Sequence, residues 1–183
     1  MSDPVDQDPR ELEAIRQLKA RYFRSVDTKD WAGVRSVFVA EAVISVECPS
    51  DPDALLRLRE RYRDGARVPG PGEEAAALTG TDAWVSTISR ALAEVRTVHH
   101  GHMPEIELTS GTTATGIWAM DDRVEWSSSG RREGACGSGH YFEDYVKGDD
   151  GWRISTMRLV YRTLEALPPE PLPPVAAAVE WGG

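Results

Sequence analysis

The sequence contains little cysteine, no long apolar run and few basic residues. Its two cysteines, Cys48 and Cys136, lie in no zinc-finger or Cys-x-x-Cys spacing, so we expect neither a disulfide framework nor a structural zinc site. No stretch approaches about 18 consecutive apolar residues. The first 30 residues are strongly charged and lack a secretory layout, which predicts a cytoplasmic protein with no membrane partner.

Basic residues are outnumbered, because 21 Lys and Arg stand against 30 Asp and Glu and give a net charge of −9. Nucleic-acid binding draws on a basic surface that neutralises phosphates, so nucleic acid is not an expected partner. The remaining composition is that of a folded protein, with 40% hydrophobic residues and six Trp among 183 residues. This length predicts one compact domain with tails or an insertion.

Helical periodicity dominates the first part of the chain. Apolar side chains recur at spacings of three and four over residues 9–26, and Asp8 followed by Pro9 is typical of a helix start. Polar capping residues at 27–30 interrupt this pattern before a second helical period begins at Trp31. Residues 42–48 then alternate with the period of a strand.

The rest of the chain predicts a third helix and then a sheet. Residues 49–80 form an irregular Pro- and Gly-containing segment, interpreted as an insertion or lid, and the helix begins near Thr81. Strands are expected at 98–108, 113–120, 139–146 and 152–163, with a long polar loop between the second and the third. The domain would span residues 8–165, and the Pro-rich residues 166–183 would form an extended tail.

Three helices followed by a curved antiparallel sheet, with one strand inserted early, indicate an α+β fold. Helices are expected to cover one face of the sheet. Where helices and sheet diverge, a cavity is the default ligand site.

Three of the four histidines are His99, His100 and His102. On a strand, His99 faces one side while His100 and His102 face the other, so one pocket cannot hold all three. A single histidine is most often a structural, half-buried imidazole. Asp27 is either a cap of the next helix or a carboxylate aimed into the core, and Tyr22 belongs to the apolar stripe of the first helix.

A pocket that combines a carboxylate, an imidazole and a phenol suits dehydratase or isomerase chemistry. Such groups can take a proton beside a carbonyl and protonate a leaving hydroxyl. This chemistry needs no metal or organic cofactor, and the sequence has no Gly-x-Gly-x-x-Gly or Walker-type loop to hold one. An alternative is a His/His/Glu metal site from His100, His102 and Glu107, a partial match to the cupin pattern.

Four stretches carry a resemblance to a known family: residues 15–31, 99–106, 113–118 and 139–145. They resemble the SnoaL-like family of the nuclear transport factor 2-like superfamily, most of all its bile-acid 7α-dehydratases and more distantly its scytalone dehydratases. The resemblance implies an α+β cone with a pocket and a dimer or trimer of identical chains.

The resemblance also implies site residues and an activity. It assigns Tyr22, Asp27 and His99 as catalytic groups of a cofactor-independent lyase or isomerase that acts on a hydrophobic ring of steroid or polyketide type. Residues Trp118, His140 and Tyr141 would contact the substrate. Val26 and Val46 replace tyrosines expected from these relatives, which leaves the substrate open. A noncatalytic binding or assembly module of the same fold is the alternative.

Overall fold

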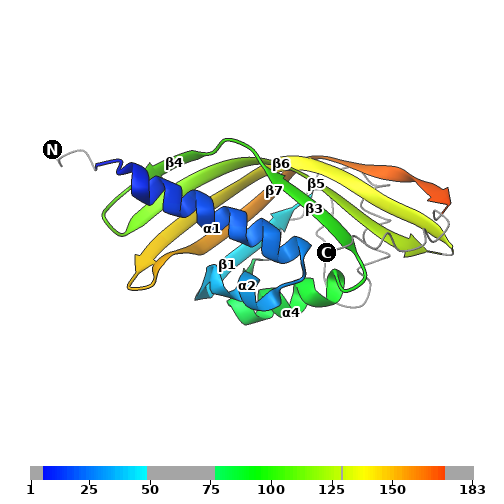
Figure 1. The fold of residues 1–183 in the computed structure, drawn as a ribbon, viewed down its shortest axis with the longest axis horizontal. Helices are drawn as coiled ribbons and strands as arrows, with labels where there is room; N and C mark the ends of the chain where they lie inside the picture. Colours follow the sequence, from blue (N-terminus) through cyan, green and yellow to red (C-terminus); the bar gives the residue numbers. More distant parts are fainter. Residues whose placement is uncertain (1–5, 49–76, 129, 172–183) are drawn as a thin grey trace, which may run out of the picture.

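The computed structural model describes residues 6–48, 77–128 and 130–171 (Figure 1). Its elements are three helices and a mixed seven-stranded sheet, which confirms the predicted α+β class. The predicted segment at 49–80 lies outside the described residues except for 77–80, where a two-residue strand pairs with the first strand of the sheet.

The helices form where capping groups and apolar spacing predict them. Helix α1 spans Pro9–Asp27, and the Asp8 carboxylate accepts a hydrogen bond from the Arg10 backbone N–H at 2.9 Å. Helix α2, Trp31–Ser36, begins after Asp30, whose carboxylate accepts from the Gly33 N–H at 2.9 Å. Helix α4 spans Thr81–Ala91. Because Asp30 is the cap of α2, Asp27 is free for another role.

The sheet has the order β2-β1-β7-β6-β5-β3, and β4 also pairs with β5. Its strands are β1 Phe38–Glu47, β2 Leu78–Thr79, β3 Arg96–Gly101, β4 Glu105–Leu108, β5 Thr113–Ser128, β6 Arg131–Gly148 and β7 Gly151–Pro171. Strand β1 runs parallel to β7, and the other pairs are antiparallel. In Figure 1, α1 crosses one face of the sheet, and β5, β6 and β7 extend as a long arm beyond the helices.

Three predictions about the sheet need correction. The single strand at 98–108 is two strands, β3 and β4. The polar loop predicted after residue 120 is instead the arm of β5 and β6, which pair residue by residue from Thr113 with Val146 to Ser128 with Arg131. Polar residues occur on both faces of this stretch, with Arg123 exposed and Asp122 and Glu125 buried, so the alternation typical of a strand with one apolar face is absent.

The Pro-rich tail also begins later than predicted, because β7 continues to Pro171. Leu167 pairs with Gly134 and Glu170 with Arg132, while the register shifts between these pairs. Pro168 and Pro169 therefore fall at an irregularity where no ladder N–H is required, which is where a strand tolerates proline. Residues 172–183 lie outside the described residues.

The main core lies between α1 and the inner face of the sheet. Ile15, Leu18 and Tyr22 of α1 are buried there with side chains from β1, β6 and β7. One position of this helix face carries a charge: Lys19 is completely buried. A smaller cluster along the arm contains Ala135 and Leu164.

Candidate active site

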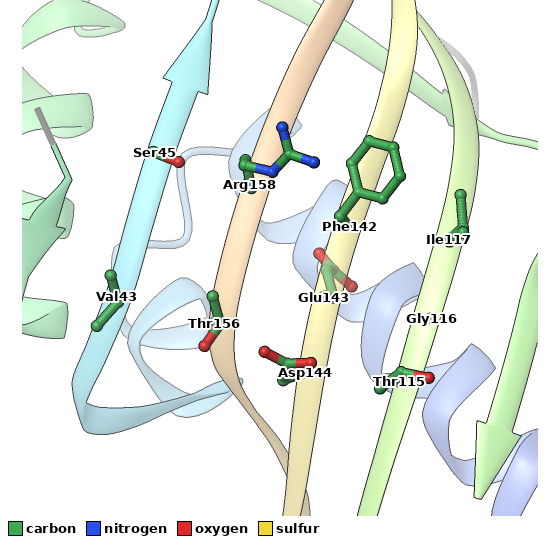
Figure 2. A pocket seen from close by; sticks show the side chains of 10 residues that line it. All are labelled: Val43, Ser45, Thr115, Gly116, Ile117, Phe142, Glu143, Asp144, Thr156 and Arg158. Atoms are coloured by element: carbon green, nitrogen blue, oxygen red, sulfur yellow. The ribbon is translucent and has the colours of Figure 1, made fainter. Parts of the chain in front are cut away.

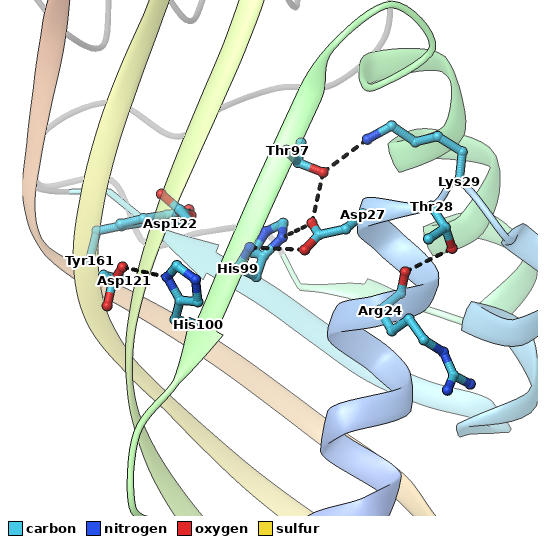
Figure 3. A network of polar contacts seen from close by, with 10 residues as sticks. All are labelled: Arg24, Asp27, Thr28, Lys29, Thr97, His99, His100, Asp121, Asp122 and Tyr161. Atoms are coloured by element: carbon cyan, nitrogen blue, oxygen red, sulfur yellow. Dashed lines mark hydrogen bonds and ion pairs between the residues drawn. The ribbon is translucent and has the colours of Figure 1, made fainter. Parts of the chain in front are cut away.

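The last residue of α1 and the middle of β3 meet in a carboxylate–imidazole pair (Figure 3). His99 Nδ1 lies 2.6 Å from Asp27 Oδ1, and the His99 backbone N–H donates to Asp27 Oδ2 at 3.0 Å. Both side chains are largely buried, with exposed fractions of 12% for His99 and 24% for Asp27. Two hydrogen bonds therefore hold His99 and Asp27 together, and solvent reaches this site only partly.

Asp27 accepts a third hydrogen bond, from the Thr97 hydroxyl to Oδ1 at 2.9 Å. Burial has the largest single effect on this carboxyl and raises its pKa, but the hydrogen bonds and the charge interaction from His99, together with the hydrogen bond from Thr97, lower the pKa by more. The pKa of Asp27 consequently lies below its ordinary value. Asp27 is thus held as an anion.

The bond to Asp27 determines the tautomer of His99. An ionised carboxylate can only accept, so the shared proton belongs on Nδ1 and leaves Nε2 as the nitrogen able to take another proton. Phe23 stacks on the imidazole at 5.8 Å between centroids with the planes 8° apart. Gly101 makes room for this ring, because a Cβ there would lie 2.6 Å from the Phe23 ring edge.

Tyr22 and Tyr141 lie in the interior next to this pair. Both rings contact Phe23, with centroids 5.8 Å and 5.7 Å away, and Tyr22 packs edge-on against Tyr141 at 6.3 Å. Burial, reinforced by the Glu143 carboxylate, raises the pKa of the Tyr22 phenol. Burial likewise raises the pKa of Tyr141. Both phenols are therefore proton-bearing donors rather than bases at neutral pH.

The structure separates the other predicted substrate contacts. Trp118 is buried, and its indole N–H donates to the Tyr145 hydroxyl at 2.8 Å. His140 precedes Tyr141 on β6 and faces the other side of the sheet, where its ring lies 6.4 Å from Phe142. His140 and Tyr141 therefore lie on opposite faces of the sheet, because adjacent strand residues alternate, and contact of both with one substrate stays a prediction.

The sequence analysis did not predict an ion pair that is buried in the interior. Lys19 Nζ lies 2.5 Å from Glu143 Oε1, and the Tyr145 hydroxyl donates to the other oxygen of Glu143. The Lys19 ammonium also lies 3.3 Å from the Tyr141 ring centroid. Burial, only partly offset by Glu143, lowers the pKa of Lys19 to about 8. A lysine four residues after Ile15 and three before Tyr22, on the apolar face of α1, was the signal in the sequence.

A second missed pair lies on the other side of His99. Asp122 of β5 is the cross-strand neighbour of His99, and the Tyr161 hydroxyl donates to its carboxylate (Figure 3). Burial raises the pKa of Asp122 above its ordinary value. Gly137 allows this contact, since a Cβ there would lie 2.4 Å from the Tyr161 ring. The pair was missed because this part of β5 was interpreted as a loop.

The residues proposed for a metal site are not brought together. His100 and His102 contact the same exposed carboxylate, with nitrogen-to-oxygen distances of 3.0 Å and 2.7 Å to Asp121. Glu107 instead pairs with Thr115, six residues along β5 from Asp121. Over the described ranges, no three His, Cys, Asp or Glu side chains are arranged to hold a metal ion.

A shallow hollow of about 320 Å³ lies on the sheet face opposite α1 (Figure 2). Arg158 lies over the Phe142 ring at 4.5 Å, and both line the hollow with hydroxyl and aliphatic side chains of neighbouring strands. The Asp27–His99 pair is on the other face of the sheet, so the hollow is a separate feature. No helix in the described part of the chain is long and apolar enough to cross a membrane.

Several solved structures are similar to this chain in fold. A protein assigned as a scytalone dehydratase from Novosphingobium aromaticivorans is 20% identical, with a TM-score of 0.65 over 92% of this chain and 95% of that one. A type 2 hexachlorocyclohexane dehydrochlorinase is 14% identical, with a TM-score of 0.65 over 91% of this chain and 95% of that one. A protein of unknown function from Mycobacterium tuberculosis is 23% identical, with a TM-score of 0.58 over 83% and 72%.

These likenesses show a common fold, the nuclear transport factor 2-like cone in which N-terminal helices cover a curved mixed sheet. The family model of the SnoaL-like domain matches residues 9–158, which include α1, the Asp27–His99 pair and the first eight residues of β7. The chain therefore belongs to the SnoaL-like domain family.

Proposed function

We propose that this protein is a cofactor-independent lyase or isomerase of the dehydratase type, with His99 as its general acid and base. The observation that carries the proposal is the 2.6 Å bond from His99 Nδ1 to Asp27, which leaves Nε2 as the proton acceptor. The same arrangement of a base oriented by a buried carboxylate recurs in unrelated enzymes. Fold alone would not support this, because one fold hosts many functions.

The proposed reaction is a proton abstraction followed by loss of a leaving group. His99 Nε2 takes a proton from the carbon beside a conjugated carbonyl, and Asp27 stabilises the imidazolium that forms. The electrons of the broken C–H bond form a C=C bond as the C–O bond breaks, and the imidazolium returns its proton to the departing hydroxyl as water. Tyr22, with Tyr141 beside it, donates a hydrogen bond to the carbonyl oxygen as charge develops there.

The charges around the site favour a neutral substrate. Asp27, Asp122 and Glu143 are carboxylates of the interior, and the ammonium of Lys19 is already paired with Glu143. An anionic substrate would bury its charge beside these carboxylates, with Lys19 engaged by Glu143 and Lys29 bonded to the Thr97 hydroxyl, and such burial is costly. A hydrophobic hydroxylated ring, of the steroid or polyketide type implied by the family resemblance, avoids this cost.

The names given to two proteins of similar fold, one assigned as a scytalone dehydratase and one a hexachlorocyclohexane dehydrochlorinase, also support lyase chemistry. The alternative is a noncatalytic binding or assembly module. It is favoured by the filling of the interior with the Lys19–Glu143 pair and by the position of the hollow on the opposite face. In that case a ligand would bind without turnover.

One experiment separates the two functions. Purified protein is incubated with a panel of neutral hydroxylated cyclic enones, and loss of water is followed by mass spectrometry. The lyase requires turnover that His99→Ala abolishes without unfolding the protein, while His100→Ala, which alters an exposed histidine on the neighbouring face, retains it. Ligand binding that persists in His99→Ala and Asp27→Ala, with no product from the unaltered protein, would instead establish the binding module.

We also propose that the chain forms a dimer or trimer of identical chains through the sheet face opposite α1. Support comes from Val43, an aliphatic side chain left 38% exposed at the hollow of that face. Light scattering coupled to size exclusion would measure the mass. A monomer at micromolar concentration would reject this assembly.

A further inference from the structure

Lys29, directly after α1, adopts a backbone conformation that lysine rarely takes. Among the described residues it is the only one other than glycine with a positive φ, at 60°. Glycine or asparagine usually occupies such a position after a helix, because other side chains are strained there. A strained backbone that persists is a reason to ask what the side chain does.

The side chain reaches back to the Asp27–His99 pair. Lys29 Nζ donates to the Thr97 hydroxyl oxygen at 2.9 Å, and the same hydroxyl lies 2.9 Å from Asp27 Oδ1. An ammonium can only donate, and a hydroxyl has one proton. Because an ionised carboxylate can only accept, the Thr97 hydroxyl donates its proton to Asp27, while one of its lone pairs accepts from Lys29 (Figure 3).

We propose that Lys29 is a positioning residue that acts through Thr97 to hold the Asp27 carboxylate ionised and aimed at His99. The inference rests on the proposed function only in taking this pair as the chemical centre. Within the described residues, the charged or titratable groups near Asp27 are His99 from β3, Lys29 from the turn after α1, Tyr22 of α1, and Asp122 of β5 beyond His99. Of these, only Lys29 is a permanent cation at neutral pH.

A simpler role for Lys29 is a favourable interaction with the carbonyl end of α1. That role would not depend on the Thr97 hydroxyl. It also would not change the titration of Asp27 through a hydrogen bond. The two roles therefore differ in whether substitutions at positions 29 and 97 have separate or shared effects.

The test is a double-mutant cycle on the Asp27 carboxyl, titrated by its ¹³C resonance. Lys29→Met and Thr97→Val are each expected to raise the pKa of Asp27 toward its ordinary value by about half a unit or more. The double variant should show a smaller shift than the sum of the two single shifts, because the hydrogen-bonded route through Thr97 is shared, while the direct charge interaction between Lys29 and Asp27 remains in Thr97→Val. Additive shifts, or no shift in Lys29→Met, would overturn the proposal.

Two further variants test whether a change in the Asp27 titration comes from backbone strain at position 29 or from the loss of any lysine. Lys29→Gly relieves the backbone, so it should unfold at the same or a higher temperature and still show the pKa shift of Lys29→Met. Lys147→Met removes a partly buried lysine that pairs with Glu11, and should leave the Asp27 titration unchanged. A lower unfolding temperature for Lys29→Gly without a pKa shift would assign Lys29 to stability alone.

The titration needs no substrate, so its outcome is independent of turnover. A non-additive shift of the Asp27 pKa, with no enzyme activity on any ring substrate, would reject the proposed lyase function and leave the positioning role of Lys29 intact. Turnover by the protein, with the Asp27 pKa unchanged in Lys29→Met, would support the lyase function and reject the positioning role of Lys29.

Discussion

Replacing Lys19 by methionine should destabilise the protein severely. Lys19 is fully buried and Glu143 is 3% exposed, and their charged atoms are 2.5 Å apart. Methionine has a similar length but no charge, so Glu143 would keep its bond from Tyr145 and lose its only counterion among the groups that contact it. Removing one partner of a buried ion pair costs about 3–5 kcal/mol.

That cost is a large part of a typical folding free energy of roughly 5–15 kcal/mol. For a chain of this size, each kcal/mol lowers the unfolding temperature by about 2–4 °C, so we expect a fall of roughly 6–20 °C. Urea unfolding followed by circular dichroism measures the change in the free energy of unfolding directly.

The matched variants isolate the ion pair from the loss of packing. Lys19→Met with Glu143→Leu removes both charges and should recover most of the stability, since an apolar replacement of a buried pair is often neutral or favourable. Lys147→Met, at a lysine whose side chain is 33% exposed, should cost less than about 1 kcal/mol. A similarly small loss for Lys19→Met, or a double variant that is less stable than the single one, would refute the reasoning.

Three more predictions concern the groups around His99. Gly137→Ala should lower the free energy of unfolding by about 1–3 kcal/mol, because its Cβ would lie 2.4 Å from the Tyr161 ring. Gly148→Ala should be tolerated, because no atom lies within 4 Å of the added Cβ. Chemical unfolding of both variants measures the difference. The raised pKa of Asp122 means that the fold binds a proton more tightly than the unfolded chain does, so stability falls as pH rises above the ordinary carboxyl pKa. Asp122→Asn should therefore gain thermal stability relative to the parent between acid and neutral pH; a constant difference across that range would contradict this. The effect of Asp27 on stability has the opposite dependence on pH. Its lowered pKa stabilises the fold above the ordinary carboxyl pKa, and this stabilisation is lost as pH falls through the pKa of the folded protein. Asp27→Asn should therefore be about 1–2 kcal/mol less stable than the parent at neutral pH and equally stable in acid.

The sequence predicted those features that depend on local periodicity. The apolar stripe and the Asp8 cap fixed α1, and the strand at residue 99 placed His99 on the face opposite His100. The meeting of Asp27 with His99 could not come from periodicity, because 72 residues separate them; the family resemblance implied it.

The remaining features depend on contacts that no local pattern encodes. Lys19 occupies a buried position only because Glu143 supplies a countercharge 124 residues later. The sequence predicted a loop at Asp122, because the polar residues of the arm resemble a turn-rich segment. The contact of Asp122 with Tyr161 depends on how the strands pair, which the local sequence does not encode. The two neighbours His140 and Tyr141 alternate between the faces of β6, so the strand places only Tyr141 on the side of the Asp27–His99 pair.

The protonation state of the His99 ring tests the central claim most directly. Long-range ¹H–¹⁵N spectra of histidine-labelled protein distinguish the two neutral tautomers, and comparison with His99→Gln assigns the resonances. For the neutral ring, the account predicts the proton on Nδ1, bound to Asp27, and an unprotonated Nε2 that can act as the base. A neutral ring with its proton on Nε2, or one that averages both forms as a solvent-exposed imidazole does, would contradict it.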